Sequence, residues 1–444
     1  MSHSERARQW VHMGSAGFAL LLRVLTWWQA ALLATFALAF NAVALPHIGG
    51  RNLYRPADEA RGFPLGILLY PLSVLLLILV FPTRMDIVAA AWGILALGDG
   101  MATIAGQTAK RKNPALPWNS DKTVAGTVAF IVFGSIAGVA LALWTRPSIA
   151  LRPPVMFSLV APIVAAVAAA FVETIPVRLD DNISVPFAAA VVLWLIALIS
   201  PEVWANSKDD VLRTLPWAAA FNTVIAWLGF RAGTVSISGA FGGAVVGVII
   251  YAAGGAGAWI LLFTAFLIAT VTSRLGLKRK MLLGIAEERG GRRGAGNAFA
   301  NCGVATLAAI SAVATPYTSA SMLALTAALA AGGSDTVASE IGKAWGRSTF
   351  LIVGFSRVKP GTPGAMSLEG TAAGIVAALA LAALAVALGL IPSAAILAVV
   401  IAATVGALVE SALGATLEPV GILNNDMLNF INTTVAAAVA IALV

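Results

Sequence analysis

The sequence predicts an all-α polytopic membrane protein built from two parallel homologous repeats. Of its 444 residues, 59% are hydrophobic and 11% are charged, with a mean hydropathy of +0.91, which excludes an ordinary soluble protein. Apolar windows long enough to cross a bilayer recur along the chain, about fourteen of roughly 20 residues each, or about seven per half. The polar motifs of the first half return in the same order in the second, as expected for an internal repeat.

The charge pattern fits a membrane surface better than a nucleic acid. The net charge is +8 and lies mostly in connecting loops, as the positive-inside rule and anionic lipid headgroups require. We therefore expect an integral protein of a bacterial inner membrane, with its motif-bearing basic loops in the cytoplasm and no nucleic-acid partner. The single cysteine, Cys302, excludes an intrachain disulfide.

In the first half, the stretch from residue 97 to residue 127 combines an acid in an apolar segment with a basic loop. Asp99 lies between two glycines within an apolar segment, where a carboxylate costs roughly 3 kcal/mol and usually has a function. Lys110, Arg111 and Lys122 follow in a basic loop, and basic side chains suit phosphate. The stretch therefore predicts phosphoryl chemistry on a membrane substrate. Spans are expected within 15–45 and at 63–82, 85–107, 123–144, 154–175 and 185–200.

The second half repeats this organisation after residue 215, which predicts two domains, 1–210 and 215–444. The paired positions are Arg8 and Arg293, His12 and Asn297, Asp99 and Asp335, Glu173 and Glu410, and Asp181-Asn182 and Asn425-Asp426. The first half has roughly fifty more residues between its arginine and its aspartate, enough for two extra crossings. Because an even number of crossings preserves direction, the repeats should be parallel. Spans are expected at 216–230, 238–253, 257–273, 298–315, 321–342, 368–390, 392–413 and 427–444.

The motifs of the first half resemble the CTP-dependent lipid alcohol kinases, the family of dolichol kinase, phytol kinase and the yeast-type diacylglycerol kinase. The resemblance rests on Glu5-x-x-Arg8-x-x-x-His12-x-Gly14, GDGMATIAG at 98–106, PWNSDKTVAGT at 117–127, and Glu173 with Asp181-Asn182. It implies transfer of a phosphoryl group from CTP to a membrane-embedded alcohol with the help of a divalent metal. Gln9 departs from the pattern, since many of these kinases have lysine there.

The second half is similar to a related family typified by the plastid and cyanobacterial phytyl-phosphate kinase. Its marks are the segments 272–303 (TSRLGLKRKMLLGIAEERGGRRGAGNAFANCG), 332–346 (GGSDTVASEIGKAWG) and 358–374 (VKPGTPGAMSLEGTAAG). This resemblance implies addition of a second phosphate to an isoprenyl monophosphate.

These motifs yield a set of candidate site residues. Carboxylate and amide oxygens suit Mg²⁺, which phosphoryl transfer needs as a bridge between phosphate oxygens. Turns rich in glycine offer unobstructed N–H groups to anions. The candidate catalytic residues are Asp99, His12, Glu173, Asp335, Glu340 and Glu410. The candidate metal ligands are Asp99, Asp335, Asp181, Asn182, Asn425 and Asp426. The candidate nucleotide- or phosphate-binding residues are Arg8, Lys110, Arg111, Lys122, Arg293, Asn297, Asn301, Lys359, Gly361, Thr362 and Gly364.

Three functions fit this pattern. The leading hypothesis is an isoprenoid salvage enzyme that uses CTP and Mg²⁺ to convert a long-chain prenyl alcohol to its monophosphate and then to its diphosphate. A CDP-lipid cytidylyltransferase would use the same acids and CTP to form a different bond. A transporter would also suit tandem repeats with intramembrane acids, although the polar residues gather near the loops rather than at mid-membrane. His12 has two readings, a catalytic base or a structural histidine at the membrane interface.

Overall fold

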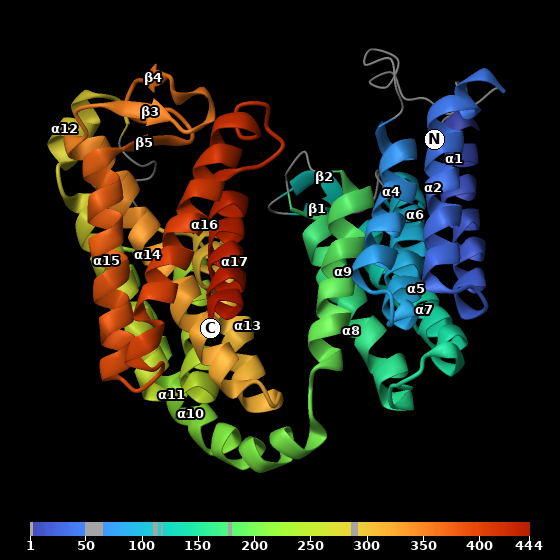
Figure 1. Cartoon of the computed structure of the whole chain (residues 1–444), viewed down its shortest axis with the longest axis horizontal. Coiled ribbons are helices and arrows are strands. Elements are labelled where there is room, and N and C mark those ends of the chain that lie inside the picture. Colours follow the sequence, from blue (N-terminus) through green and yellow to red (C-terminus); the bar gives the residue numbers. More distant parts are fainter. Residues whose placement is uncertain (1–2, 49–64, 110–113, 117–118, 176–179, 286–291) are drawn as a thin grey trace. The chain divides into compact units, whose positions relative to one another are not determined.

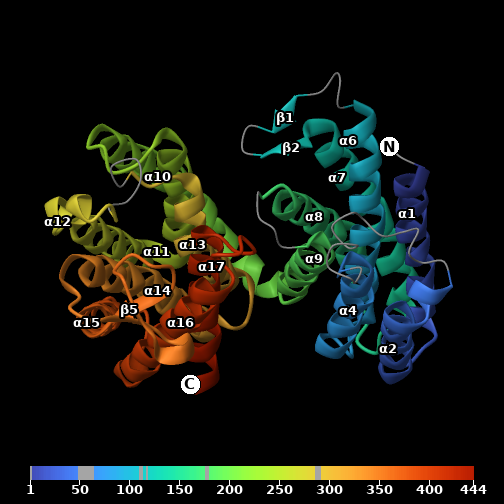
Figure 2. The same ribbon diagram turned by 90° about the horizontal axis from the view of Figure 1, so that it is seen from above.

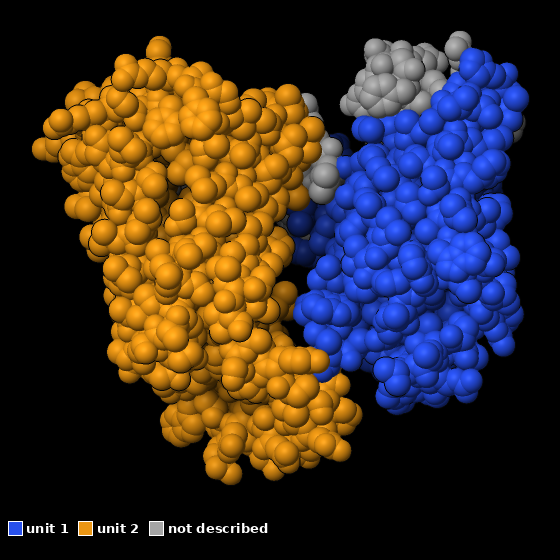
Figure 3. All heavy atoms as spheres, viewed as in Figure 1, with its two compact units in different colours: residues 1–198 blue, residues 199–444 orange. Residues whose placement is uncertain are grey.

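A computed structural model describes residues 3–48, 65–109, 114–116, 119–175, 180–285 and 292–444. The chain forms two compact units, Met1–Leu198 and Ile199–Val444 (Figure 3). The predicted boundary at 210–215 falls instead inside helix α10 (Pro201–Arg231). The charged stretch there resembles a linker, yet Ser200 caps the helix through the N–H of Val203, and Pro201 occupies the first turn, so the helix starts well before it.

Unit 1 is a bundle of helices with one small sheet (Figure 1). Its acid-bearing helix is interrupted by a π turn, η4 (Ile94–Asp99), between α5 (Met85–Gly93) and α6 (Gly100–Ala109). Such turns insert one extra residue and are frequent at functional sites. The other elements are α1 (His3–Gly14), η1 (Ser15–Arg23), α2 (Trp27–Val43), η2 (Leu45–His47), α4 (Leu65–Val80), β1 (Ala115–Leu116), β2 (Asn119–Thr123), α7 (Val124–Thr145), η5 (Arg146–Ser148), α8 (Val155–Glu173) and α9 (Asp181–Ala197).

Unit 2 is arranged around α14 (Thr318–Trp345), which contacts α11, α13, α15, α16 and α17 (Figures 1 and 2). Most of its buried residues are alanine, glycine, serine or threonine, and such small residues let neighbouring helices approach closely in membrane proteins. The other elements after α10 are α11 (Ile237–Arg274), α12 (Leu277–Leu282), α13 (Ala295–Ala314), β3 (Thr349–Leu351), η7 (Val353–Phe355), β4 (Arg357–Val358), β5 (Ala365–Ser367), α15 (Leu368–Ala387), η8 (Ser393–Ala395), α16 (Ile396–Thr416) and α17 (Asn425–Leu443).

The polytopic helical class is confirmed, but fewer separate spans are found among the described residues than expected. Within the described ranges, nine helices are long and apolar enough to cross a membrane, or up to ten if α9 and α10 together count as one span. This is fewer than the about fourteen expected, seven per half, in part because α11 counts once although it covers two of the expected segments. The span expected at 63–82 is the 16-residue α4, and the one expected at 216–230 is the second half of the long α10. The one at 321–342 corresponds to α14, whose small polar residues keep it out of the apolar set.

Helix α11 folds back on itself at Gly255, where the backbone adopts φ 80° and ψ 177°. A Cβ added to Gly247 would lie 3.4 Å from Nε1 of Trp259, whereas twelve residues of straight helix span about 18 Å. The two limbs therefore pack against each other. They correspond to the segments 238–253 and 257–273 that the sequence predicts as separate spans.

Two small antiparallel sheets follow the acid-bearing helices, where the sequence analysis expected loops. Strand β1 pairs with β2, and the order in the second sheet is β4-β3-β5. Each sheet leads into a helix capped by its last strand residue. Thr123 accepts from the N–H of Gly126 at 3.2 Å, and Ser367 accepts from that of Gly370 at 3.1 Å. The same local construction thus occurs once in each unit.

Candidate active sites

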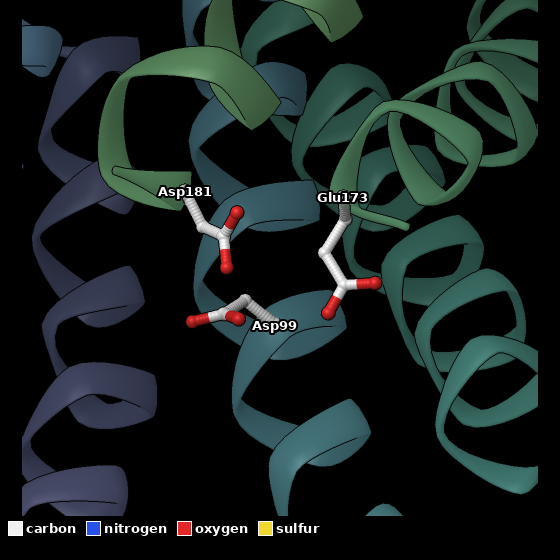
Figure 4. A group of neighbouring side chains, drawn as sticks. All are labelled: Asp99, Glu173 and Asp181. Atoms are coloured by element: carbon white, nitrogen blue, oxygen red, sulfur yellow. The ribbon is translucent and has the colours of Figure 1, made fainter. Parts of the chain in front are cut away.

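Unit 1 brings three predicted acids together. Asp99 ends η4, Glu173 ends α8 and Asp181 begins α9, and their carboxylate oxygens lie within 4.8 Å of one another (Figure 4). Figure 4 shows the three side chains pointing toward a common space. Mg²⁺ binds oxygen at about 2.1 Å, which sets opposite ligands about 4.2 Å apart. This group therefore fits a divalent cation after small side-chain movements.

Lys122 on β2 lies against the acidic group. Its Nζ forms ion pairs with Glu173 and with Oδ2 of Asp181, the latter at 3.3 Å. Burial disfavours the ammonium form, but the charges of Asp181 and Glu173 outweigh burial and raise the pKa of Lys122. The side chain is therefore charged at neutral pH and offsets part of the negative charge of the acidic group. Nearby, a cavity of about 200 Å³ is lined by Lys122 and Glu173 together with Gly106, Gln107 and Gly126.

His12 is positioned beside the acidic group by a packed aromatic. Its Nε2 lies 3.5 Å from Oδ2 of Asp99, and its ring meets the Tyr70 ring edge-on at 4.7 Å. The Tyr70 hydroxyl in turn accepts hydrogen bonds from Ser15 at 2.7 Å and from Trp92 at 2.8 Å. The imidazole is thus held by its surroundings next to a candidate metal ligand.

The other candidates of unit 1 have separate surroundings. Arg8 is half-buried on α1, one turn before His12. The side-chain N–H groups of Asn182 donate to Asp180 at 2.8 Å and to the Gly66 carbonyl at 3.5 Å, so this amide fastens the start of α9. Lys110 and Arg111 lie outside the described residues.

Unit 2 gathers most of its predicted site residues around one polar cavity of about 350 Å³. They come from α13 and the residues just before it, α14, the turn after β4, α16 and the start of α17. Residues so distant in sequence converge because α14 contacts both α13 and α16. The predicted residues lining the cavity are Arg293, Asn297, Asn301, Asp335, Gly361, Thr362, Gly364, Glu410 and Asn425.

Two carboxyl groups meet in this cavity. The side chains of Asp335 on α14 and Glu410 on α16 both line it and lie close together. Two carboxylates in contact repel each other unless a proton or a cation lies between them. Asn425 lines the same space and adds an amide oxygen, and Glu418 lines it as a third acid, so these residues also fit an oxygen-liganded cation.

The glycine-rich turn packs against the helix that carries Glu410. The carbonyl of Lys359 accepts from the N–H of Thr362 at 3.2 Å and from its hydroxyl at 2.8 Å. Gly361 and Gly364 have φ of 86° and 70°, which glycine adopts without strain. A Cβ on Gly364 would lie 2.3 Å from the carbonyl oxygen of Ser411, so only glycine allows this close approach to α16.

Among the described residues of unit 2, three predicted site residues lie outside the lining of the polar cavity: Lys359, Glu340 and Asp426. The Lys359 side chain is exposed, and the Asp426 carboxylate packs against Gly296 on α13. Glu340 is 2% exposed and forms an ion pair with Lys280, which is 1% exposed. Its other oxygen accepts from Lys343 at 3.1 Å, and Lys343 does line the cavity. Glu340 thus lies outside the cavity lining and positions Lys343, which lies in it.

Sequence reasoning missed Lys280 as part of this arrangement. It stands among Lys278 and Arg279, both exposed, and nothing in their order marks the one that turns inward. Its Nζ also donates to the Ser273 carbonyl at 2.7 Å. Ser367, which caps α15, lines the cavity too. Its place directly before the apolar run that begins at Leu368 is a helix-start signal that could have drawn attention to it.

Helices that cross a membrane and carry converging acids and bases at their ends define an integral membrane protein with two polar sites. The chain belongs to the family described as integral membrane protein DUF92, whose model matches residues 220–437. An uncharacterized membrane protein of Synechocystis is 41% identical over 202 residues, covering 45% of this chain and 78% of that protein.

Two relatives have more specific names. The chloroplastic protein VTE6 of Arabidopsis thaliana is 37% identical over 216 residues, 47% of this chain and 64% of that protein. The chloroplastic phytol kinase 1 of Arabidopsis thaliana is 30% identical over 132 residues, 29% of this chain and 43% of that protein. The chain thus matches less than two thirds of either one. No solved structure matches the chain.

Proposed function

We propose that this protein is an isoprenoid salvage kinase that phosphorylates a prenyl alcohol of the phytol type and then phosphorylates the resulting monophosphate, with CTP as donor. The first step is assigned to unit 1 and the second to unit 2. The observation that carries the proposal is the convergence of Asp99, Glu173 and Asp181 around Lys122. The similarity to a phytol kinase supports an isoprenoid alcohol as the acceptor.

In unit 1, Asp99, Glu173 and Asp181 would hold Mg²⁺, which would supply positive charge to neutralise the phosphates. Lys122 then turns from the carboxylates to the phosphates, and Arg8 adds a second positive charge. The alcohol oxygen forms a bond to the γ-phosphorus of CTP while the bond to the β–γ bridging oxygen breaks, and CDP leaves. His12, beside Asp99, takes the hydroxyl proton.

The residue paired with His12 fits the different acceptor proposed for unit 2. Asn297 lines the polar cavity where the sequence pairing places the counterpart of His12. An amide does not act as a base at neutral pH, but a phosphate monoester, with a second pKa of about 6, is already largely deprotonated there. A phosphate oxygen therefore attacks without a base. The shared order of helix, sheet and capped helix in each unit supports the proposal of an internal repeat.

The location of the sites follows from their substrates. We place both polar sites at the cytoplasmic ends of the helices, where nucleoside triphosphates are available, while the bilayer supplies the long-chain isoprenoid. Fusion of the two activities keeps an amphiphilic monophosphate in the same membrane as the second site.

The test is a reconstitution in lipid nanodiscs with Mg²⁺, a panel of prenyl alcohols and CTP labelled at either its α- or its γ-phosphate. We expect γ-label in lipid monophosphate first and in diphosphate later, and no α-label in lipid. Transfer of α-label would replace the kinase with a cytidylyltransferase. Absence of lipid product with any nucleotide would favour transport.

His12→Asn is expected to lower kcat/KM for the alcohol by about 10²–10⁴-fold, the usual contribution of a positioned general base. Phosphorylation of added monophosphate should stay unchanged, because that reaction uses the other unit. The measurement is initial rates with alcohol and with monophosphate, each over a pH range. Full alcohol kinase activity in the variant would give His12 a purely structural role at the membrane interface.

A further inference from the structure

A second cavity in unit 2 adjoins the polar one. It measures about 150 Å³ and lies among α10, α11, α13 and α14. Its walls are mostly apolar, with aromatic and aliphatic side chains facing small residues of α11. The two cavities share the lining residues Arg293, Asn297, Asn301 and Thr336. The apolar space therefore continues directly from the place where phosphate-binding side chains gather.

The two ends of this cavity differ in chemistry. At the polar end, the guanidinium of Arg293 lies 5.8 Å from the centre of the Phe266 ring. At the far end, the indole N–H of Trp259 donates to Oδ1 of Asn222 at 2.8 Å, and both side chains are buried. Trp259 also stacks on Phe263 with ring centres 5.0 Å apart. Trp259, held by Asn222 and stacked on Phe263, closes this end of the cavity.

One wall of the cavity is open. Gly243 on the first limb of α11 is exposed, and a Cβ built there would meet no heavy atom within 4 Å. The neighbouring Phe241 is 72% exposed and Leu267, on the second limb, is 44% exposed. In a membrane helix such apolar exposure faces lipid, so Gly243 marks an exit from the cavity toward the bilayer.

We propose that this cavity encloses the first isoprene unit of an isoprenyl phosphate, while the rest of the chain leaves past Gly243 into the lipid. The proposal rests on the function proposed above and names the part of the substrate that the protein recognises. A cavity of about 150 Å³ holds a group the size of a benzene ring, which matches one five-carbon unit. The phosphate then lies at Arg293 and Asn297, with the apolar chain directly behind it.

Selectivity follows from this geometry. The unit next to the phosphate is enclosed by protein, so its branching and its double bond face fixed walls. The distal chain lies in lipid, where a longer or shorter tail makes the same kind of contact. We expect the protein to discriminate among acceptors at the first isoprene unit and to accept a wide range of total chain lengths.

The test places a bulky side chain at the exit. Gly243→Leu is expected to lower kcat/KM for geranylgeranyl monophosphate at least tenfold, because the side chain occupies the path of the tail. Dimethylallyl monophosphate, which has one isoprene unit, should be converted within about twofold of the wild-type rate. Gly17→Leu, at another exposed glycine with no neighbour within 4 Å, should change neither rate. Equal losses for both substrates, or none for either, would overturn the proposal.

A binding experiment separates this proposal from the kinase assignment. A prenyl monophosphate with a diazirine in its first isoprene unit should crosslink to peptides of α10 and α11 in the wild-type protein and in Asp335→Asn. Gly243→Leu should reduce the crosslinks of a long-chain probe. If the wild-type protein gave these crosslinks but showed no phosphoryl transfer with any nucleotide, the kinase would be refuted and the cavity kept. Crosslinks confined to α15 and α16 would refute the cavity.

Discussion

Asp335→Asn should stop the conversion of prenyl monophosphate to diphosphate and cause the monophosphate to accumulate. The Asp335 carboxyl lies near Glu410 at the polar cavity, and an amide of the same shape cannot neutralise the charge of a cation there. Loss of a group that stabilises transferring phosphate commonly costs several kcal/mol, so a drop of at least about a hundredfold is expected. The measurement is the ratio of the two lipid products over time, starting from the alcohol.

Two further variants make this result specific. Asp99→Asn should do the reverse, abolishing use of the alcohol while leaving added monophosphate convertible. Asp426→Asn removes a carboxylate that packs on Gly296 outside the cavity lining, and it should leave both steps within a few-fold of wild type. If Asp99→Asn and Asp335→Asn each removed both activities, the protein would have one composite site instead of two.

Lys280→Met should strongly destabilise unit 2. Lys280 and Glu340 are 1% and 2% exposed and form an ion pair, so removal of the lysine leaves a buried carboxylate with only Lys343 for compensation. Breaking a buried pair on one side typically costs about 3–5 kcal/mol. The measurement is the unfolding free energy in mixed micelles, followed by tryptophan fluorescence, since Trp345 stands at the end of the same helix as Glu340.

The double variant Lys280→Met/Glu340→Gln tells a structural role from a catalytic one. With both charges removed, no uncompensated carboxylate remains, and most of the lost stability should return. If Glu340 acts only by holding Lys343, the folded double variant should keep phosphoryl transfer within about tenfold. A stable double variant with a loss of a hundredfold or more would show that Glu340 itself takes part in the reaction.

The chemistry of the residues allowed the acids to be predicted from the sequence, but not their convergence in space. Asp99 stood out because a carboxylate is costly in an apolar segment, and Glu173 stood out at a membrane boundary. Their approach to within 4.8 Å of Asp181 depends on how three helices pack, which no local pattern encodes. Glu340 shows the opposite outcome. It was predicted as a catalytic residue because it lies in a polar motif, but it forms a buried ion pair with Lys280.

The predicted boundaries of helices and strands were wrong where the sequence pattern was short or mixed. The strands have two to five residues, too few for an alternating pattern to be recognised. Counting apolar windows treated α4 and the second half of α10 as full crossings, and only the structure shows how they end. The helix hairpin at Gly255 was more accessible, because the Gly-Gly pair there interrupts two apolar runs of similar length.

The π turn that ends at Asp99 controls direction as well as position. One residue added to a helical turn rotates everything after it by about 100° around the axis. Without it, a side chain at this point in the chain would leave the helix on another side, away from His12 and Glu173. The rotational phase of helix 85–109 therefore decides whether the acid joins its partners, so a one-residue insertion or deletion between residues 94 and 98 would be far more disruptive than a substitution there.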